Sequence, residues 1–217
     1  MRKWMAFLLA ILILGLGGCK SSGVAEEPEK EQDTQPRIEE LTEEELASFA
    51  QMFSLEHTYE GDYWWYNMAL TSEYDRPENL DLYNFFYNGF KDELAGPEEL
   101  ERLEQEGLWM ELDIQKNPVQ KMDQVLKTYF GLSLEQTNGV GLDGMIYLAE
   151  TDSYYKCAGD FWCGEGAVFI RGHRTEDGRV VLYYQNYLDE ECVIMLVEAS
   201  EESEMPYYVF SHMPNQS

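Results

Sequence analysis

Three carboxylates flank a pair of tyrosines in the C-terminal half of the chain, and this grouping could perform hydrolytic chemistry. Glu150, Asp152 and Asp160 surround Tyr154 and Tyr155. Many glycoside hydrolases use two carboxyl groups about 5–9.5 Å apart across a sugar-sized cleft. A glycan-directed hydrolase that uses these acids is therefore one hypothesis for the sequence.

Other catalytic and metal-binding patterns are missing from the sequence. It holds 42 acidic residues, so acidic clusters also arise by chance. Carboxylates can ligate calcium, but the EF-hand loop pattern is absent. Three histidines, His57, His173 and His212, occur without a Gly-x-Ser-x-Gly nucleophile motif. We therefore predict a non-enzymatic protein with no catalytic residue, no metal and no cofactor, and keep the hydrolase as the alternative.

The aromatic residues offer a different chemistry, which is the stacking of a sugar or a peptide. Aromatic pairs occur at 64–65, 154–155 and 161–162, and the last pair lies between glycines in an expected loop. Loop residues often carry binding functions. We predict ligand contacts by Trp162, Phe161, Tyr155 and Trp65. The alternative is that these rings are core residues, as most aromatics are in a domain of this size.

Composition limits the class of partner. The chain of 217 residues has a formal net charge of −27, while 44% of its residues are hydrophobic. The apolar content is ample for a globular core. Nucleic-acid binding depends on lysines and arginines that neutralise phosphates. We therefore predict no nucleic-acid partner.

Cysteine pairing stays open at this point. Cys157, Cys163 and Cys192 form an odd set, which allows at most one internal disulfide. Buried thiols and a single bridge are both compatible with the sequence.

The first half of the domain is expected to be mainly helical. Thr42 and Glu45 have capping-box spacing ahead of an apolar helical stripe. Further helices are predicted from Asp81, from Pro97 and from the Asn117-Pro118 pair as far as Gly131, with a single turn after Ser133. The bulky run 63–66 favours a strand or a buried extended segment.

The second half is expected to be a sheet. Short strands are predicted at 145–148 and 153–157, followed by strands at 168–173, 179–187, 193–198 and 207–212 joined by short turns. Helices first and strands second is the α+β pattern. We predict N-terminal helices packed on a C-terminal antiparallel β-meander of about four to six strands.

The N-terminus has the order of an export signal. Arg2 and Lys3 precede an apolar run at 4–14, and Leu16-Gly17-Gly18-Cys19 follows. This sequence resembles the lipobox of bacterial lipoproteins. The resemblance implies cleavage between Gly18 and Cys19, a diacylglycerol-type, palmitate-bearing lipid on the Cys19 thiol, and anchoring at the extracytoplasmic face of the cell membrane.

Three regions then follow from the leader and from the composition. We predict a signal peptide at 1–18, a disordered lipid-anchored tether at 19–37 and a single α+β domain at 38–217, because the tether has few large apolar residues. The expected partners are the membrane, through Cys19, and an extracytoplasmic protein, peptide or glycan. A structural or assembly role at the membrane is a further alternative.

Other stretches resemble a family of uncharacterised bacterial lipoproteins. They lie at 71–78, 81–89, 129–139 and 150–155, with Gly159-Asp160 beyond them. The resemblance implies a lipid-anchored domain and implies no particular reaction.

Overall fold

The computed structural model describes residues 38–54, 63–90, 92–108, 113–157 and 166–215. The predicted signal peptide, the tether and Cys19 lie outside these residues. The chain divides into a unit of residues 1–35 and a unit of residues 36–217, and the second unit holds all the structure described below.

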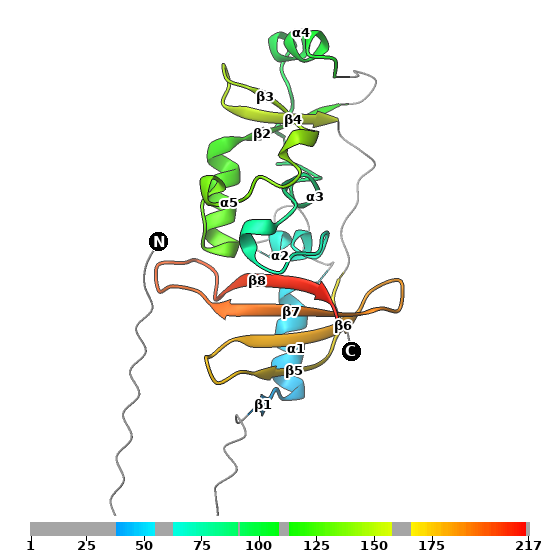
Figure 1. The fold of residues 1–217 in the computed structure, drawn as a ribbon, viewed down its shortest axis with the longest axis vertical. Coiled ribbons are helices and arrows are strands. Elements are labelled where there is room, and N and C mark those ends of the chain that lie inside the picture. Colours follow the sequence, from blue (N-terminus) through cyan, green and yellow to red (C-terminus); the bar gives the residue numbers. More distant parts are fainter. Residues whose placement is uncertain (1–37, 55–62, 91, 109–112, 158–165, 216–217) are drawn as a thin grey trace, which may run out of the picture. The chain divides into compact units, whose positions relative to one another are not determined.

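A five-stranded antiparallel sheet contains most of the C-terminal residues (Figure 1). Its spatial order is β1 (Glu39–Glu40), β5 (Phe169–Arg174), β6 (Val180–Gln185), β7 (Glu191–Glu198) and β8 (Tyr207–Pro214). Consecutive strands pair from β5 to β8, so the expected meander is confirmed. Cys192, Ile194 and Leu196 are the buried positions of β7, in the strict alternation expected of a sheet with one covered face.

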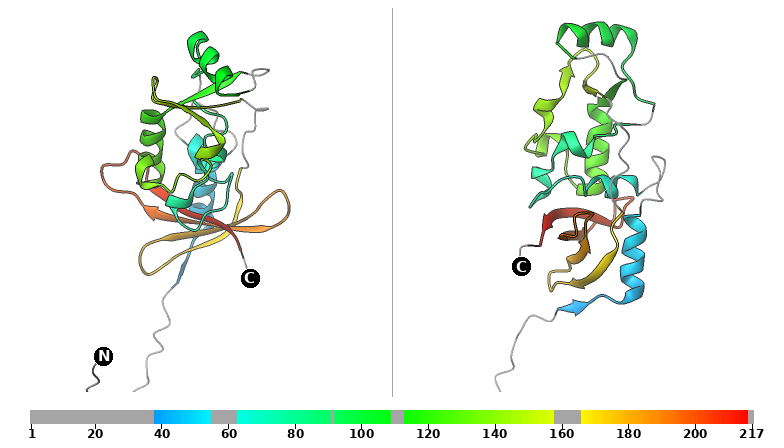
Figure 2. Two further views of the ribbon diagram at one scale, coloured as in Figure 1. Left: turned by 45° about the horizontal axis from the view of Figure 1, so that its top comes forward. Right: turned by 90° about the vertical axis from the view of Figure 1, so that its right-hand side faces the viewer.

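Helix α1 (Glu43–Met52) packs beside the sheet near β5 (Figure 2). The predicted capping box starts it: Glu45 N–H donates to Thr42 Oγ1 over 3.2 Å, and Thr42 N–H donates to Glu45 Oε2 over 2.9 Å. Phe49 and Met52 form its buried side. Phe53 follows the helix and meets Phe169 edge to face at 5.5 Å, which joins α1 to the sheet.

The aromatic run at 63–66 begins a helix, α2 (Trp64–Met68), so the expectation of a strand or a buried extended segment is wrong. Bulky aromatics favour strands mainly through the packing that a sheet provides, and here helical packing meets the same need. The Tyr66 ring lies 5.2 Å from the rings of Phe53 and Tyr129. Its hydroxyl donates to the Tyr207 carbonyl oxygen over 2.5 Å, which ties α2 to β8.

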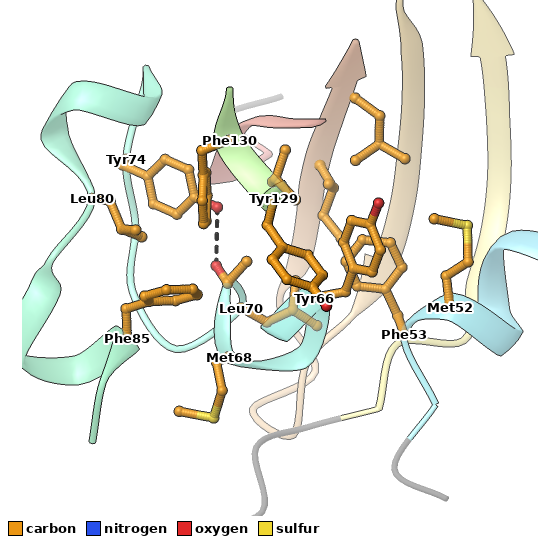
Figure 3. Packing of buried hydrophobic residues seen from close by; sticks show 14 of the residues in the cluster. Met52, Phe53, Tyr66, Met68, Leu70, Tyr74, Leu80, Phe85, Tyr129 and Phe130 are labelled. Atoms are coloured by element: carbon orange, nitrogen blue, oxygen red, sulfur yellow. Dashed lines mark hydrogen bonds between the residues drawn. The ribbon is translucent and has the colours of Figure 1, made fainter. Parts of the chain in front are cut away.

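The main hydrophobic core lies where these elements meet, and Figure 3 shows part of it. Leu80 and Phe85, from the segment around α3 (Leu82–Phe85), lie opposite Phe130 of α5 (Val119–Phe130). Tyr74 donates its hydroxyl to the Ala69 carbonyl oxygen over 3.2 Å. Helix α5 ends at Gly131, whose φ of 69° is the left-handed cap that favours glycine. A 3-10 turn, η1 (Pro77–Asn79), precedes α3.

A second, three-stranded sheet has the order β2 (Ile114–Pro118), β4 (Ser153–Cys157) and β3 (Ile146–Leu148). Helix α4 (Pro97–Gln105) packs on it through a separate hydrophobic cluster of Leu103, Ile114, Leu148 and Tyr155. Strand β2 was not expected, because its sequence is polar and ends in the Asn117-Pro118 pair that predicts a helix start. Two 3-10 turns, η2 (Leu134–Gln136) and η3 (Leu142–Gly144), connect α5 to β3.

Candidate functional site

Two tyrosines form a pair on the β3–β4 hairpin. Tyr147 and Tyr154 are register partners, and their ring centroids lie 5.0 Å apart with an interplanar angle of 44°. Tyr147 is 47% exposed, so its ring reaches solvent. Sequence analysis missed Tyr147. Pairing the predicted strands 145–148 and 153–157 as a hairpin would have placed it opposite Tyr154.

The pair lines a groove of about 570 Å³ between the start of α5, the η2–η3 connection and the hairpin. The described residues that line it are Val119, Asp123, Leu134, Glu135, Thr137, Asn138, Gly139, Leu142, Tyr147, Asp152 and Tyr154. Another groove of about 490 Å³ lies between α5 and the β7–β8 loop, and Tyr208 is the one aromatic among its described lining residues. The first groove therefore combines acids with an aromatic pair.

The charge of the groove wall is negative. Asp123, Glu135 and Asp152 contribute carboxylates, and none of the described lining residues carries a positive charge. Asp152 Oδ1 accepts a hydrogen bond from the Tyr147 hydroxyl over 2.8 Å, and this bond raises the pKa of Tyr147. Asp152 has a φ of 46°, an uncommon conformation for a residue with a side chain.

Asp123 is an ion-paired wall residue. Its Oδ2 lies 2.5 Å from the Lys127 Nζ, one helical turn along α5, and its Oδ1 accepts from the Leu134 N–H over 3.0 Å. Partial burial opposes ionisation of Asp123, but these two contacts outweigh it and the pKa is lowered. Asp123 is therefore ionised at neutral pH.

Hydrogen bonds hold the far wall of the groove in place. Ser133 N–H donates to Gln136 Oε1 over 2.7 Å at the start of η2. Asn138 donates through its backbone N–H to the Glu78 carbonyl oxygen over 2.8 Å and through Nδ2 to Asn79 Oδ1 over 2.7 Å. Together with the Leu134 N–H bond to Asp123, these contacts anchor the connection to α5 and η1.

Of the four contact residues expected from sequence, the structure describes Tyr155 and Trp65, and neither of them lines this groove. Tyr155 is 0% exposed in the small core under α4, so its ring offers no face to a ligand. Trp65 is half-buried and its ring lies 5.2–5.4 Å from those of Phe85, Phe86 and Phe90. Phe161 and Trp162 lie outside the described residues. For Tyr155 the expectation of ligand contact is corrected, because the strand turns alternate side chains to opposite faces.

The structure describes two of the three acids of the predicted cluster, Glu150 and Asp152. Asp152 lines the groove, whereas Glu150 is exposed on the β3–β4 turn and is not among the residues that line it. Asp160 lies outside the described residues. The hydrolase therefore stays an untested alternative. Among the described residues, no group of three or more acids, histidines or cysteines is placed to hold a metal ion.

The two described histidines, His173 and His212, lie on strands of the large sheet, and each has its ring near a tyrosine ring. His212, on β8, is 5% exposed; its Nε2 lies 2.8 Å from the Tyr184 hydroxyl and its Nδ1 lies 2.7 Å from the Ser72 carbonyl oxygen. Burial lowers the pKa of His212 although the Ser72 carbonyl opposes this. His173 lies on β5 with its ring 6.0 Å from that of Tyr183, and His57 is outside the described part.

The cysteine question stays open. Cys192 is buried on β7 and Cys157 is partly buried at the end of β4. Cys163 lies outside the described residues, so neither alternative for pairing is decided.

A buried lysine was missed by sequence analysis. Lys156, on β4, is 1% exposed; its Nζ donates to the Tyr83 carbonyl oxygen over 3.0 Å. The Nζ also lies 4.2 and 4.3 Å from the ring centroids of Tyr83 and Tyr87. Burial lowers the pKa of Lys156 to about 7, against the opposing charge of Asp81. In the sequence, burial of Lys156 is indicated only by its place in the predicted strand 153–157, between the apolar residues Tyr155 and Cys157.

Comparisons of the chain with protein-family models, with curated proteins and with solved structures gave no match. The resemblance to bacterial lipoproteins therefore stays a prediction from the sequence. Within the described ranges, no helix has the length and apolar character needed to cross a bilayer.

Proposed function

We propose that this protein is a lipid-anchored, extracytoplasmic binding protein whose groove at Tyr147 and Tyr154 takes a cationic segment of a peptide or protein. The lipobox-like sequence at 16–19 and the polar stretch after it support the anchor and the tether. The groove supports the binding role. In this proposal the protein does not catalyse a reaction, and the lipid on Cys19 attaches it to the membrane.

One observation carries the choice of ligand: a tyrosine pair, of which Tyr147 is exposed and Tyr154 partly buried, lies beside carboxylates on a wall whose described residues carry no positive charge. An ammonium or guanidinium group gains from an aromatic face about 0.5–2 kcal/mol, depending on how far it is desolvated. Carboxylates add a further attraction that salt weakens. A neutral glycan would use the rings but would gain nothing from the net negative charge.

A binding measurement with short charged peptides tests the ligand class. The full chain in detergent should bind an oligolysine peptide and should not bind an oligoglutamate peptide of equal length. The double variant Tyr147→Ala, Asp152→Asn should weaken oligolysine binding about tenfold, which corresponds to about 1.4 kcal/mol. Added salt should weaken binding further.

The matched control is Glu176→Gln, which removes one exposed carboxylate from the β5–β6 turn. It changes the net charge as Asp152→Asn does, but outside the groove. Equal losses in the control and in the double variant would mean that the peptide follows net charge alone, and would contradict the proposed site.

A separate experiment tests the anchor. Mass spectrometry of the membrane-extracted protein should find Cys19 as the first residue, carrying a diacylglyceryl group. Cys19→Ala should leave the leader uncleaved and the thioether lipid absent. A native chain that begins elsewhere, or an unmodified Cys19, would contradict the anchor and leave the groove to be judged by the peptide measurement.

A further inference from the structure

Three polar residues share one face of the small sheet. In the β2–β4 register, Gln115 is opposite Lys156 and Asn117 is opposite Tyr154. Alternate residues of a strand point to opposite faces. Gln115 and Asn117 therefore share a face with Lys156, while Ile114 and Tyr155 belong to the cluster under α4 on the other face.

This face packs on the segment that contains α3. Lys156 Nζ donates to the Tyr83 carbonyl oxygen, and Gln115 Nε2 donates to the Asn88 carbonyl oxygen over 2.8 Å. Gly89 lies against the Gln115 side chain, because an added Cβ there would come 3.1 Å from its Cδ and Oε1. The three polar side chains are therefore enclosed between two layers of protein.

The enclosed polar atoms are not fully paired by protein groups. Asn117 is 0% exposed, and within the described structure neither its Nδ2 nor its Oδ1 has a hydrogen-bond partner. The same holds for the buried Oε1 of Gln115. Lys156 Nζ can donate up to three hydrogen bonds, and one acceptor is found for it among the described residues. More than nine in ten buried polar groups in proteins are paired with protein or water, so this concentration in one place needs a partner.

The balance of donors and acceptors identifies the partner. Asn117 Oδ1 and Gln115 Oε1 require donors, whereas Asn117 Nδ2 and Lys156 Nζ require acceptors. A metal cation would satisfy only the oxygens, and an anion would satisfy only the nitrogens. Water both donates and accepts, and a buried water typically makes two to four hydrogen bonds.

We propose that the face of the small sheet turned toward α3 encloses an internal water site, in which one or more ordered waters bridge the Asn117 amide to Gln115 Oε1 and Lys156 Nζ. The site explains how polar residues at three neighbouring positions are kept in a buried layer. None of its three residues is among the described residues that line the Tyr147–Tyr154 groove, although Asn117 is the register partner of Tyr154, and the water site does not depend on the proposed ligand.

Water-selective nuclear Overhauser spectroscopy on the full, isotope-labelled chain in detergent tests the site in solution. The side-chain amide protons of Asn117 should give a cross-peak to water with the sign of a long-lived, bound molecule. The resonance is assigned by its loss in Asn117→Leu. A missing cross-peak, or one with the sign of freely exchanging surface water, would overturn the proposal.

A variant separates water from the exchanging protons of the lysine itself. In Lys156→Met the Asn117 amide and Gln115 Oε1 remain, so the cross-peak should persist. Its disappearance would assign the signal to the ammonium protons and would overturn the proposal. In a crystal of the full chain, density about 2.7–3.2 Å from the Asn117 amide and from one of its two neighbours would support it. Direct pairing of that amide with protein groups would overturn it.

Discussion

Lys156 holds its side-chain nitrogen against Tyr83 in two ways at once: Nζ donates to the Tyr83 carbonyl oxygen over 3.0 Å and lies 4.2 Å from the centroid of the same residue's ring. The Tyr87 ring lies on the nitrogen as well, at 4.3 Å. No carboxylate in the described structure forms an ion pair with it, and Asp81 acts only at longer range. Two aromatic faces and a carbonyl thus replace the counter-ion that a buried lysine usually has.

Lys156→Met should stabilise the protein at and below neutral pH. The pKa of Lys156 is about 7 in the folded chain, against 10.5 as the ordinary value. Between these values the unfolded chain binds more protons, so the stability of the native protein rises with pH. Below about pH 7 the lysine is charged in the folded chain, and burying this charge lowers the free energy of unfolding by its full amount. Methionine has no charge and removes this loss. We expect a gain of about 2–4 kcal/mol near pH 6 that shrinks toward pH 10.

Urea denaturation at several pH values measures this difference. Lys121→Met is the control, because Lys121 is a half-exposed surface lysine that pairs with Glu93. Lys121→Met should not show the gain in stability near pH 6 that is expected of Lys156→Met, because Lys121 is not buried. A Lys156→Met variant that is less stable near pH 6 would contradict the burial argument.

Tyr155→Phe should destabilise the contact between α4 and the small sheet. The Tyr155 hydroxyl donates to Glu99 Oε1 over 2.6 Å and lies 2.7 Å from Thr151 Oγ1. Burial opposes ionisation of Glu99, but hydrogen bonds from Lys116, from Tyr155 and from the Gly96 N–H lower its pKa. Losing a hydrogen bond to this charged group should cost about 1.5–3 kcal/mol. Thermal unfolding measures the loss.

Tyr147→Phe is the comparison for that variant. It removes a hydroxyl that also donates to a carboxylate, that of Asp152, but at an exposed position. Water replaces the exposed bond, so the loss of stability should be smaller than in Tyr155→Phe. Equal losses in the two variants would show that burial of the Glu99 contact contributes nothing.

The buried imidazole of His212 should make the protein sensitive to mild acid. Burial lowers the pKa of His212 below its ordinary value of 6.5, with the Ser72 carbonyl and Glu73 acting in the opposite direction. As the pH falls through 6.5, the unfolded chain takes up a proton before the folded chain does, so stability falls in that window. His212→Gln should lack this part of the acid-dependent loss of stability. At neutral pH the variant should be less stable than the unchanged protein, because it loses the contacts of the imidazole with Tyr184 and Ser72.

Denaturation between about pH 7.5 and about pH 5 measures the His212 effect as the difference in slope between the variant and the unchanged chain. His173→Gln serves as the control, because it removes a half-buried imidazole of β5 that lies beside Tyr183. This control should keep the acid-dependent loss. An unchanged slope in His212→Gln would contradict the prediction.

Gly141→Ala should disturb the wall of the groove. Gly141 has a φ of 81°, and an added Cβ would meet Asp81 Oδ1 and come 2.9 Å from Cβ and backbone N of Tyr83. The left-handed conformation alone costs a residue with a side chain about 1–2 kcal/mol. Gly107→Ala carries that cost only, because its φ is 89° with open space around it. The urea midpoint of Gly141→Ala should therefore fall further than that of Gly107→Ala, and equal midpoints would contradict the contact.

Local signals in the sequence were enough for elements that local chemistry defines. The capping box at Thr42 starts α1, and Gly131 ends α5. The predicted strands of the meander lie within two residues of their observed bounds, and β7 has the alternation of a strand with one covered face. The leader and its cysteine stay a prediction, which rests on the order of residues 1–19.

Only the tertiary structure decided which aromatic residues are surface and which are core. The same run of strand β4 contributes Tyr154 to the groove and Tyr155 to the core, and the choice depends on which face α4 covers. The aromatic run 63–66 forms the start of α2, where the Tyr66 ring packs against the rings of Phe53 and Tyr129. Lys156 is buried because its face of the sheet meets α3. These outcomes depend on contacts between residues far apart in the chain, which residue type and spacing do not encode.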